Sequence, residues 1–282
     1  MGYNNDVMIH IKDGEVEYLK FKILEKYGDS INHVITLRHG GVSEYPCESL
    51  NFRTIGKDKK ENLLSNLKII CDKIGFEDKN VFKAKQNHTD KVLIIDNNNK
   101  EKYSFSKFSM EEFDAYTTNE KNIATLVTTA DCNPIIIYDP IKNVVSNIHS
   151  GWKGTIKKIY LNAIDIMVQK FNSNVEDLIF CIGPSIKKCC FTSKEKSFKE
   201  KFTDIWKEEN EYIYYEEDSD IFHIDLSYVI KKDILQKGIK EENIAICDIC
   251  TMCNHKDFFS YRIATKNNYE DYGTFATIVY LK

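Results

Sequence analysis

Three side chains of the kinds that bind transition metals stand where strand-like runs of this sequence meet loops. They are His88, Cys132 and His149. Two imidazoles and a thiolate form a common set of protein ligands for catalytic zinc, with the fourth position left for water or substrate. Because side chains at strand–loop junctions can converge on one cleft, the sequence predicts a mononuclear zinc site formed by these three residues.

Arginine is rare in this chain, and the few that occur are candidates for binding an anion. Of the 39 basic residues, only Arg38, Arg53 and Arg262 are arginine. A guanidinium can clamp a phosphate or carboxylate with two parallel hydrogen bonds, which a lysine cannot do. Arg38 follows a strand-like run and precedes Gly40-Gly41, where the backbone can approach a ligand closely. We therefore expect Arg38 to take part in catalysis and Arg262 to bind substrate, whereas Arg53 could equally be an ordinary surface residue.

Other polar residues in the same segments complete the candidate site. Asn51 is a suitable clamp for substrate, and Lys153 lies in a Gly151–Gly154 turn that precedes a helix and can offer amide donors to an anion. Asp131, directly before Cys132, is the candidate for moving a proton. It could instead orient His88 or His149 through a hydrogen bond.

A second group of cysteines lies near the C-terminus. Cys247, Cys250 and Cys253 form a Cys-x-x-Cys-x-x-Cys pattern, which is compatible with a zinc or iron–sulfur site. No fourth ligand stands at matching spacing, although His255 or the Cys189-Cys190 pair could be brought to it by the fold. Small buried thiols are the favoured interpretation of this pattern.

The elements that position these residues are a mixture of strands and helices. Strands are predicted from apolar, β-branched runs, at 34–37, 92–95, 124–128, 135–138, 144–148, 178–182, 244–249 and 275–281. Helices are predicted over about 61–74, 154–171 and 226–237, the last with Asp225 as N-cap and Gly238 as the C-terminal signal. The pattern indicates one α+β domain over residues 1–282, with residues 1–30 as a peripheral N-terminal segment.

Composition narrows the class of protein further. The formal net charge is −4, so no basic field would hold nucleic acid or an anionic membrane. No segment reaches the ~20 apolar residues of a membrane helix, and no secretory signal is recognisable at the N-terminus. An odd number of cysteines, nine, favours free thiols and metal ligands over a disulfide framework. We expect a cytoplasmic protein that acts on a small molecule.

From about Thr36 to Leu281 the chain resembles the bacterial multicopper polyphenol oxidoreductase, or laccase-domain, family. Members have been described as purine nucleoside phosphorylases with adenosine deaminase activity, and one branch as a peptidoglycan editing factor. The resemblance rests on segments in the same order, namely Arg38-x-Gly40-Gly41-Val42-Ser43, Ser49-Leu50-Asn51, Gln86-x-His88, Asp114-Ala115, Thr129-Ala130-Asp131-Cys132-x-Pro134, His149-x-Gly151-Trp152-x-Gly154, Gly183-Pro184-x-Ile186, Cys250-Thr251 and Phe259-Ser260-Tyr261-Arg262.

The resemblance implies a four-layer α/β/β/α sandwich with mixed sheets and zinc bound by His88, Cys132 and His149. It also implies phosphorolysis of adenosine, inosine or methylthioadenosine, or zinc-assisted deamination of adenosine. The chain departs from the family at Lys153 and Thr274, where arginine is usual, and at Thr89, where glycine is usual. The loss of an arginine at Thr274 removes one anion contact, so substrate preference is expected to differ.

Three alternatives follow from the same residues. Copper laccase chemistry is disfavoured, because the chain has seven histidines, no two of them separated by a single residue, and four coppers need many imidazoles. A Cys–His amide hydrolase acting on a cell-wall precursor would use Cys132 as nucleophile and His149 as base. A metal-stabilised binding module would leave Arg38 and Asn51 without a role.

Overall fold

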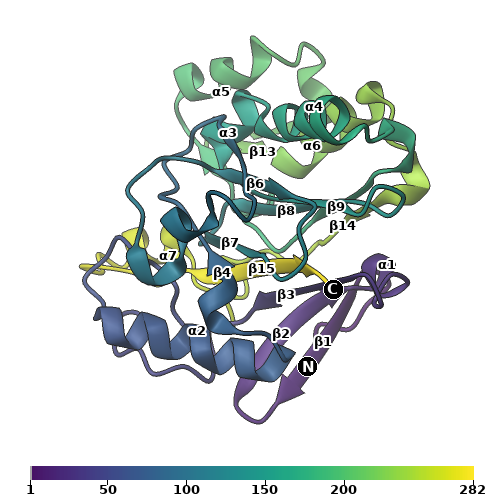
Figure 1. The fold of residues 1–282 in the computed structure, drawn as a ribbon. Coiled ribbons are helices and arrows are strands. Elements are labelled where there is room, and N and C mark those ends of the chain that lie inside the picture. The colour runs from purple at the N-terminus through teal and green to yellow at the C-terminus, as the bar shows by residue number, and fades with distance from the viewer. Residues whose placement is uncertain (1) are drawn as a thin grey trace.

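The computed structural model describes residues 2–282. Two six-stranded sheets lie face to face, and helices cover the outer face of each sheet (Figure 1). The four layers run from α2 (Lys60–Ile74) through the two sheets to α4 (Ile159–Phe171) and α6 (Leu226–Lys237). This is the predicted α/β/β/α arrangement of an α+β fold.

The first sheet combines the two ends of the chain. Its strands follow the order β1 (Met8–Asp13), β2 (Val16–Phe21), β3 (Ile31–Thr36), β15 (Phe275–Leu281), β7 (Ala124–Thr129) and β4 (Val81–Phe82). All neighbours are antiparallel except β4 and β7, which are parallel. The sheet therefore brings β7, which leads into Cys132, to its interior.

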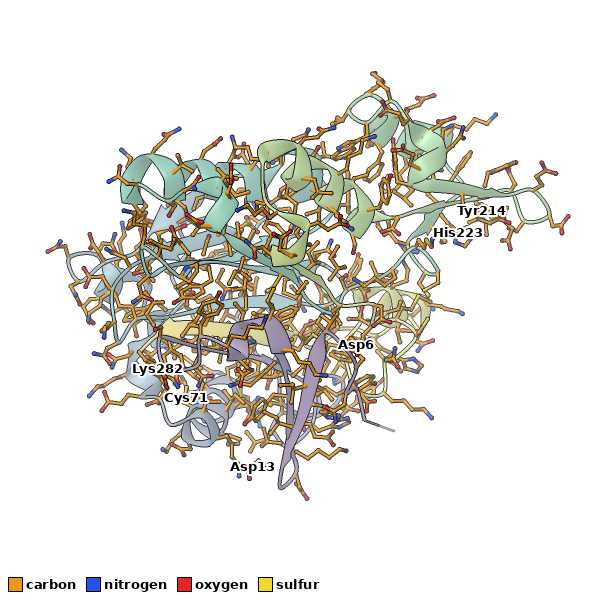
Figure 2. The ribbon with its side chains drawn as sticks, turned by 90° about the vertical axis from the view of Figure 1, so that its right-hand side faces the viewer. Asp6, Asp13, Cys71, Tyr214, His223 and Lys282 are labelled. Atoms are coloured by element: carbon orange, nitrogen blue, oxygen red, sulfur yellow. The ribbon has the colours of Figure 1, made fainter. Side chains whose placement is uncertain are left out.

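The second sheet carries the other metal-ligand candidates. Its order is β14 (Ile244–Ile246), β10 (Ile179–Ile182), β8 (Asn133–Asp139), β9 (Val144–Ser150), β6 (Ala115–Thr118) and β5 (Val92–Ile94). A small third sheet of β11 (Thr192–Ser193), β13 (Ile221–Ile224) and β12 (Ile213–Glu216) projects beside α5 (Lys196–Thr203). Figure 2 shows this projection with Tyr214 and His223 labelled. Short helices α1 (Lys22–Glu25), α3 (Trp152–Ile156) and α7 (Tyr261–Lys266) complete the fold.

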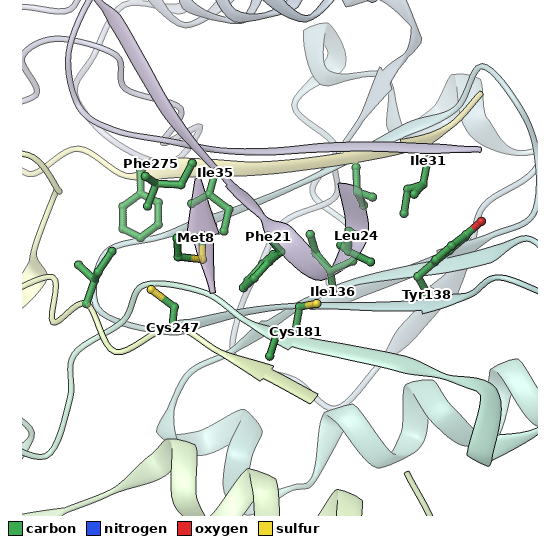
Figure 3. Close-up of a cluster of buried hydrophobic side chains, with 14 of the residues drawn as sticks. Met8, Phe21, Leu24, Ile31, Ile35, Ile136, Tyr138, Cys181, Cys247 and Phe275 are labelled. Atoms are coloured by element: carbon green, nitrogen blue, oxygen red, sulfur yellow. The ribbon is translucent and has the colours of Figure 1, made fainter. Parts of the chain in front are cut away.

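The core explains why the strand runs are continuously apolar. Successive side chains of a strand point to opposite faces, and here both faces of each sheet are covered. Ile35 and Ile136 pack between the sheets, whereas Val34 packs against α2 and Ile135 packs under α4 and α6. Figure 3 shows the layer between the sheets, where strands from both contribute side chains.

Most predicted elements are present, and two expectations need correction. All eight predicted strand runs overlap strands, although the run over 244–249 is a strand only as far as Ile246. The helices α2 and α6 match their predicted ranges, and the Asp225 side chain accepts from the backbone N–H of Tyr228. The predicted helix over 154–171 is divided into α3 and α4, because Lys158 takes a left-handed backbone with φ of 56°. The N-terminal segment is not peripheral, since Met8 and Phe21 are fully buried between the sheets.

None of the helices in residues 2–282 is long and apolar enough to cross a membrane.

Candidate functional site

The fold brings the three predicted metal ligands together. Cys132 lies in the turn between β7 and β8, His149 lies near the end of β9, and His88 lies in the loop before β5. The Cys132 Sγ is 3.7 Å from the His88 Nε2, and one ligand atom from each residue lies within 4.8 Å of the others. Spacing of this kind allows one ion to contact all three.

Asp114, directly before β6, contacts both histidines. Its carboxylate lies 2.7 Å from the His149 Nδ1, which leaves the Nε2 of that ring available to a metal. The same carboxylate accepts hydrogen bonds from the backbone N–H groups of Asn87, His88 and Thr89. A carboxylate behind a ligating histidine is the usual arrangement that sets the tautomer and ring orientation in metal sites.

Two further residues shape the ligand group. The Gln86 side chain pairs with both backbone groups of Thr128, at 2.8 Å each, and so joins the His88 loop to the end of β7. A Cβ on Gly151 would lie 2.6 Å from the His88 Cδ2 and 2.7 Å from the Cys132 Sγ. Only glycine therefore fits at this position beside the three ligands.

The protonation state of Cys132 suits metal binding, whereas His149 must release a proton when a metal binds. Burial lowers the pKa of His149, but the neighbouring Cys132 and Asp114 outweigh burial and raise it to about 9, and a histidine ligand must be neutral. Burial raises the pKa of the Cys132 thiol, but the neighbouring His149 and His88 imidazoles outweigh burial and hold it at about 6. A thiol with this pKa is mostly thiolate at neutral pH, and the thiolate is the form that binds metals. The donor set, the carboxylate behind His149 and the glycine cradle all fit one metal ion.

A cavity of about 630 Å³ opens over these ligands. Its basic side chains are Arg53, Lys83, Lys153 and Arg262. Its aromatic side chains are Trp152, Phe191, Phe198, Tyr261 and Tyr272. Among the lining residues in the described part of the chain, Asp131 is the one carboxylate. The cavity is therefore locally cationic in a protein with a net negative charge.

Of the predicted substrate-binding residues, Arg262 and Lys153 line the cavity. The Arg262 Nη1 donates to the carbonyl of Cys190 at 3.1 Å, and this contact holds the guanidinium at the cavity wall. Thr129 and Thr274 also line the cavity, and their buried hydroxyls have no hydrogen-bond partner within residues 2–282.

Arg38 was expected to take part in catalysis and Asn51 to bind substrate, but neither residue lines the cavity. The Arg38 guanidinium donates to the carbonyls of Glu48 and His255 and stacks over Phe259 at 4.5 Å. The Asn51 Oδ1 accepts from the backbone N–H groups of Arg53 and Thr274. Their hydrogen bonds hold together the loops behind the cavity, and Asn51 thereby positions two lining residues.

Asp131 lines the cavity but is already fully engaged. Its carboxylate accepts from the Thr251 hydroxyl at 2.6 Å, the Ser260 hydroxyl at 2.9 Å and the backbone N–H of Arg262 at 2.8 Å. No hydrogen bond joins it to His88 or His149 in the described chain, and Asp114 takes that place. These contacts engage both carboxylate oxygens and tie Asp131 to the backbone of Arg262, and its expected movement of a proton stays a prediction.

Sequence reasoning did not place Asp114, Lys83 or Arg53 at the site. Asp114 stood in a family motif, but only the tertiary structure shows which histidine it contacts. Lys83 is buried in the lining of the cavity, although its sequence neighbours are those of an ordinary strand end. Arg53 stacks over the Tyr272 ring at 3.8 Å and pairs with Asp271, and its rarity as an arginine was the available signal.

Comparison with known proteins supplies named relatives. Purine nucleoside phosphorylase LACC1 of Mus musculus is 28% identical over 83% of this chain and 52% of its own length, so the chain spans about half of that relative. A purine nucleoside phosphorylase of Clostridium acetobutylicum is 34% identical over 76% of this chain and 81% of its own. Adenosine deaminase RL5, from an unknown prokaryotic organism, is 28% identical over 63% of this chain and 68% of its own.

A solved structure and a family model agree with these relatives. The hypothetical protein YfiH of Bacillus licheniformis shares the fold with a TM-score of 0.86 and 24% identity, over 97% of this chain and 99% of that one. The family model described as multi-copper polyphenol oxidoreductase laccase matches residues 32–282. The chain therefore belongs to the multi-copper polyphenol oxidoreductase laccase family.

Proposed function

We propose that this protein is a zinc-dependent purine nucleoside phosphorylase that acts on adenosine, inosine or methylthioadenosine. The observation that carries the proposal is the cavity, which places a three-ligand metal group beside four basic side chains and a set of aromatic rings. Basic side chains suit phosphate, and aromatic faces suit a purine base. The names of the relatives from Clostridium acetobutylicum and Mus musculus support the same reaction.

The proposed reaction exchanges one bond for another at the ribose. A phosphate oxygen forms a bond to C1′ as the bond from C1′ to the purine nitrogen breaks. The bonding electrons leave with the purine, which takes up a proton. The other product is ribose 1-phosphate, or its 5-methylthio derivative when methylthioadenosine is the substrate. The chain must therefore bind two substrates, stabilise negative charge and keep water away from C1′.

The residues of the cavity can perform these tasks. Arg262, Lys153 and the buried Lys83 offer cationic donors in the cavity lining. Trp152 and Phe198 pack edge to face at 5.1 Å and leave apolar surface toward a base. A zinc ion held by His88, Cys132 and His149 would supply Lewis-acid polarisation of a phosphate or purine atom. Charge stabilisation in a partly enclosed site is stronger than in water.

Incubation with adenosine, inosine and methylthioadenosine, with and without phosphate, tests the proposal. Chromatography should show free purine only when phosphate is present. Formation of inosine from adenosine in the absence of phosphate would reveal the deaminase reaction, which the relative RL5 makes a second activity to measure. Purine release that is independent of phosphate would contradict phosphorolysis.

Because Lys83 is buried, we expect the KM for phosphate to change with pH in a characteristic way. Burial lowers the pKa of Lys83 to about 8, so its charged form falls from about 90% at pH 7 to about 10% at pH 9. Phosphate binding favours the charged form, and the KM for phosphate should rise about tenfold over this interval. Lys83→Met should have a high KM for phosphate already at pH 7.

At each pH, the KM of Lys83→Met for phosphate is divided by the KM of wild type. Both proteins meet phosphate in the same ionisation state, so this ratio removes the ionisation of phosphate from the comparison. Lys85→Met is the matched control, because Lys85 pairs with Glu112 and does not line the cavity. Identical pH profiles for wild type and Lys83→Met would exclude Lys83 from phosphate binding.

Copper loading is expected to give no oxygen-dependent turnover of phenols. Two imidazoles and a thiolate can also bind copper, so copper uptake alone says nothing about activity. Within residues 2–282, His88 and His149 are the only histidines in a group able to hold a metal. Reduction of dioxygen to water needs several electrons, and one copper cannot store them. Oxygen consumption in proportion to phenol oxidation, lost on copper removal, would overturn this expectation.

A thiol hydrolase is the second candidate, because Cys132, His149 and Asp114 together have the composition of a Cys–His–Asp triad. A hydrolase requires a free Cys132 thiolate, whereas the zinc site requires this thiolate to be bound to the metal. Alkylation of Cys132 by iodoacetamide should be slow in the purified protein and at least about tenfold faster after chelation. Equal rates with and without chelator would favour the hydrolase.

A further inference from the structure

We propose that Cys189, Cys190, Cys250 and Cys253 bind one zinc ion at a second site, separate from the cavity ligands. The four sulfurs all lie within 4.8 Å of one another. The proposal is independent of the reaction proposed above, because these side chains do not line the cavity.

The spacing of the sulfurs is that of ligands around a single ion. Cys253 Sγ lies 3.4 Å from Cys190 Sγ and 3.8 Å from Cys189 Sγ. Tetrahedral zinc with Zn–S bonds of about 2.3 Å requires sulfurs about 3.8 Å apart. A disulfide would require about 2.05 Å. Four thiolates also exclude hard cations such as calcium and magnesium, which prefer oxygen.

Two loops far apart in sequence supply the four thiols. Cys189 and Cys190 lie in a turn in which the Cys190 N–H donates to the Lys187 carbonyl at 2.8 Å. Cys250 is paired with Ser185 in a β-bridge, and the chain turns back at Cys253. The Cys250-x-x-Cys253 spacing is the usual way in which one turn supplies two zinc ligands.

Backbone donors and a basic side chain lie beside the cluster. The backbone N–H groups of Lys187 and Cys253 donate to the Cys250 sulfur. The Lys187 side chain is an additional cation close to Cys250. Cys189 and Cys253 are exposed, so an ion can reach the site from solvent.

Cys247, the remaining member of the sequence pattern, does not belong to the site. It is fully buried between the two sheets with Cys181 and Met8, as Figure 3 shows. Its thiol therefore packs as a small apolar side chain, as the sequence interpretation favoured for the whole pattern. Cys250 is buried as that interpretation expects, whereas Cys253 is exposed, and the fold brings Cys189 and Cys190 to both.

A zinc ion at this site would brace one wall of the cavity. Arg262 donates to the carbonyl of Cys190, and Thr251 donates to Asp131, which in turn accepts from the Arg262 backbone. The two cysteine loops thus hold the arginine from both sides. Four thiolates leave no open position, so the role is structural rather than catalytic.

Metal analysis of four proteins purified in reductant tests the proposal. Wild type should carry two zinc ions per chain, Cys132→Ala one, Cys189→Ser/Cys253→Ser one, and Cys247→Ala two. Cobalt(II) gives a second readout, because its near-ultraviolet absorption scales with the number of bound thiolates. Cys132→Ala should retain about four-fifths of that absorption, and the double serine variant about one-fifth.

The cobalt spectrum of Cys132→Ala leaves the four cysteines intact, so misfolding of the double variant cannot obscure the result. Absence of thiolate-to-cobalt absorption in Cys132→Ala would overturn the second site. So would an unchanged zinc content in a folded double variant, or a disulfide among these cysteines in the native protein. Loss of the cavity zinc alone would contradict the proposed function and leave this inference standing.

Discussion

Replacing Cys132 with alanine is expected to remove one zinc ion per chain and to lower phosphorolysis at least about 100-fold. Cys132 Sγ is the only thiolate donor of the cavity group, and it lies 3.7 Å from the His88 Nε2. Loss of partners that merely orient ligands already costs about 10- to 100-fold in metal affinity or activity, and a direct ligand should cost more. Zinc content by mass spectrometry and initial rates with inosine provide the measurement.

Cys71→Ala is the matched control for this variant. Cys71 is buried on the inner face of α2, and within residues 2–282 it contributes to no metal group. It should lower the free energy of unfolding slightly and leave zinc content and activity unchanged. If Cys132→Ala retains both its zinc and its activity, the metal is bound elsewhere or is not needed for the reaction.

Asp114→Asn is expected to weaken zinc binding by about 10- to 100-fold, although Asp114 touches no metal. Hydrogen bonds from His149, Thr89 and other donors hold the pKa of Asp114 at about 2, against the opposing effect of burial, so it is an ionised acceptor. Both carboxylate oxygens face N–H donors. An amide NH₂ in place of either oxygen would face another donor. The free energy of unfolding of the zinc-free protein should therefore fall by about 2–3 kcal/mol.

Glu112→Gln makes the same chemical change two residues away and serves as the control. Glu112 pairs with Lys85 at the surface, and an exposed ion pair contributes little to stability. Zinc titration with a competing chelator and urea unfolding of both variants give the comparison. Equal zinc affinity in Asp114→Asn and wild type would show that the carboxylate does not orient the ligands.

Local sequence patterns predicted many of the helices and strands, for identifiable physical reasons. The apolar runs of β7, β8, β9 and β15 are long and β-branched because both faces of each sheet are buried. The α6 helix carries signals at both ends, in Asp225 and Gly238. The β1–β2 hairpin was missed because its strands alternate polar and apolar side chains weakly and lie at a sheet edge.

The site was predicted in part, because residue type points to chemistry but not to position. His88, Cys132 and His149 could be proposed as ligands from their types, and the fold was needed to show that they meet. Arg38 and Arg53 have the same rare side chain, yet only Arg53 lines the cavity. Two loops separated by about 60 residues form the four-cysteine group, and no spacing rule in the sequence connects them.

The most direct test of the phosphorylase proposal is ³¹P nuclear magnetic resonance of zinc-loaded protein incubated with inosine and phosphate. Wild type should convert phosphate to ribose 1-phosphate in equal amount to the hypoxanthine released. Cys132→Ala, purified identically, should show no such conversion, which excludes a contaminating phosphorylase. Hypoxanthine release without a ribose 1-phosphate signal, or equal conversion by both proteins, would contradict the assignment of phosphorolysis to this cavity.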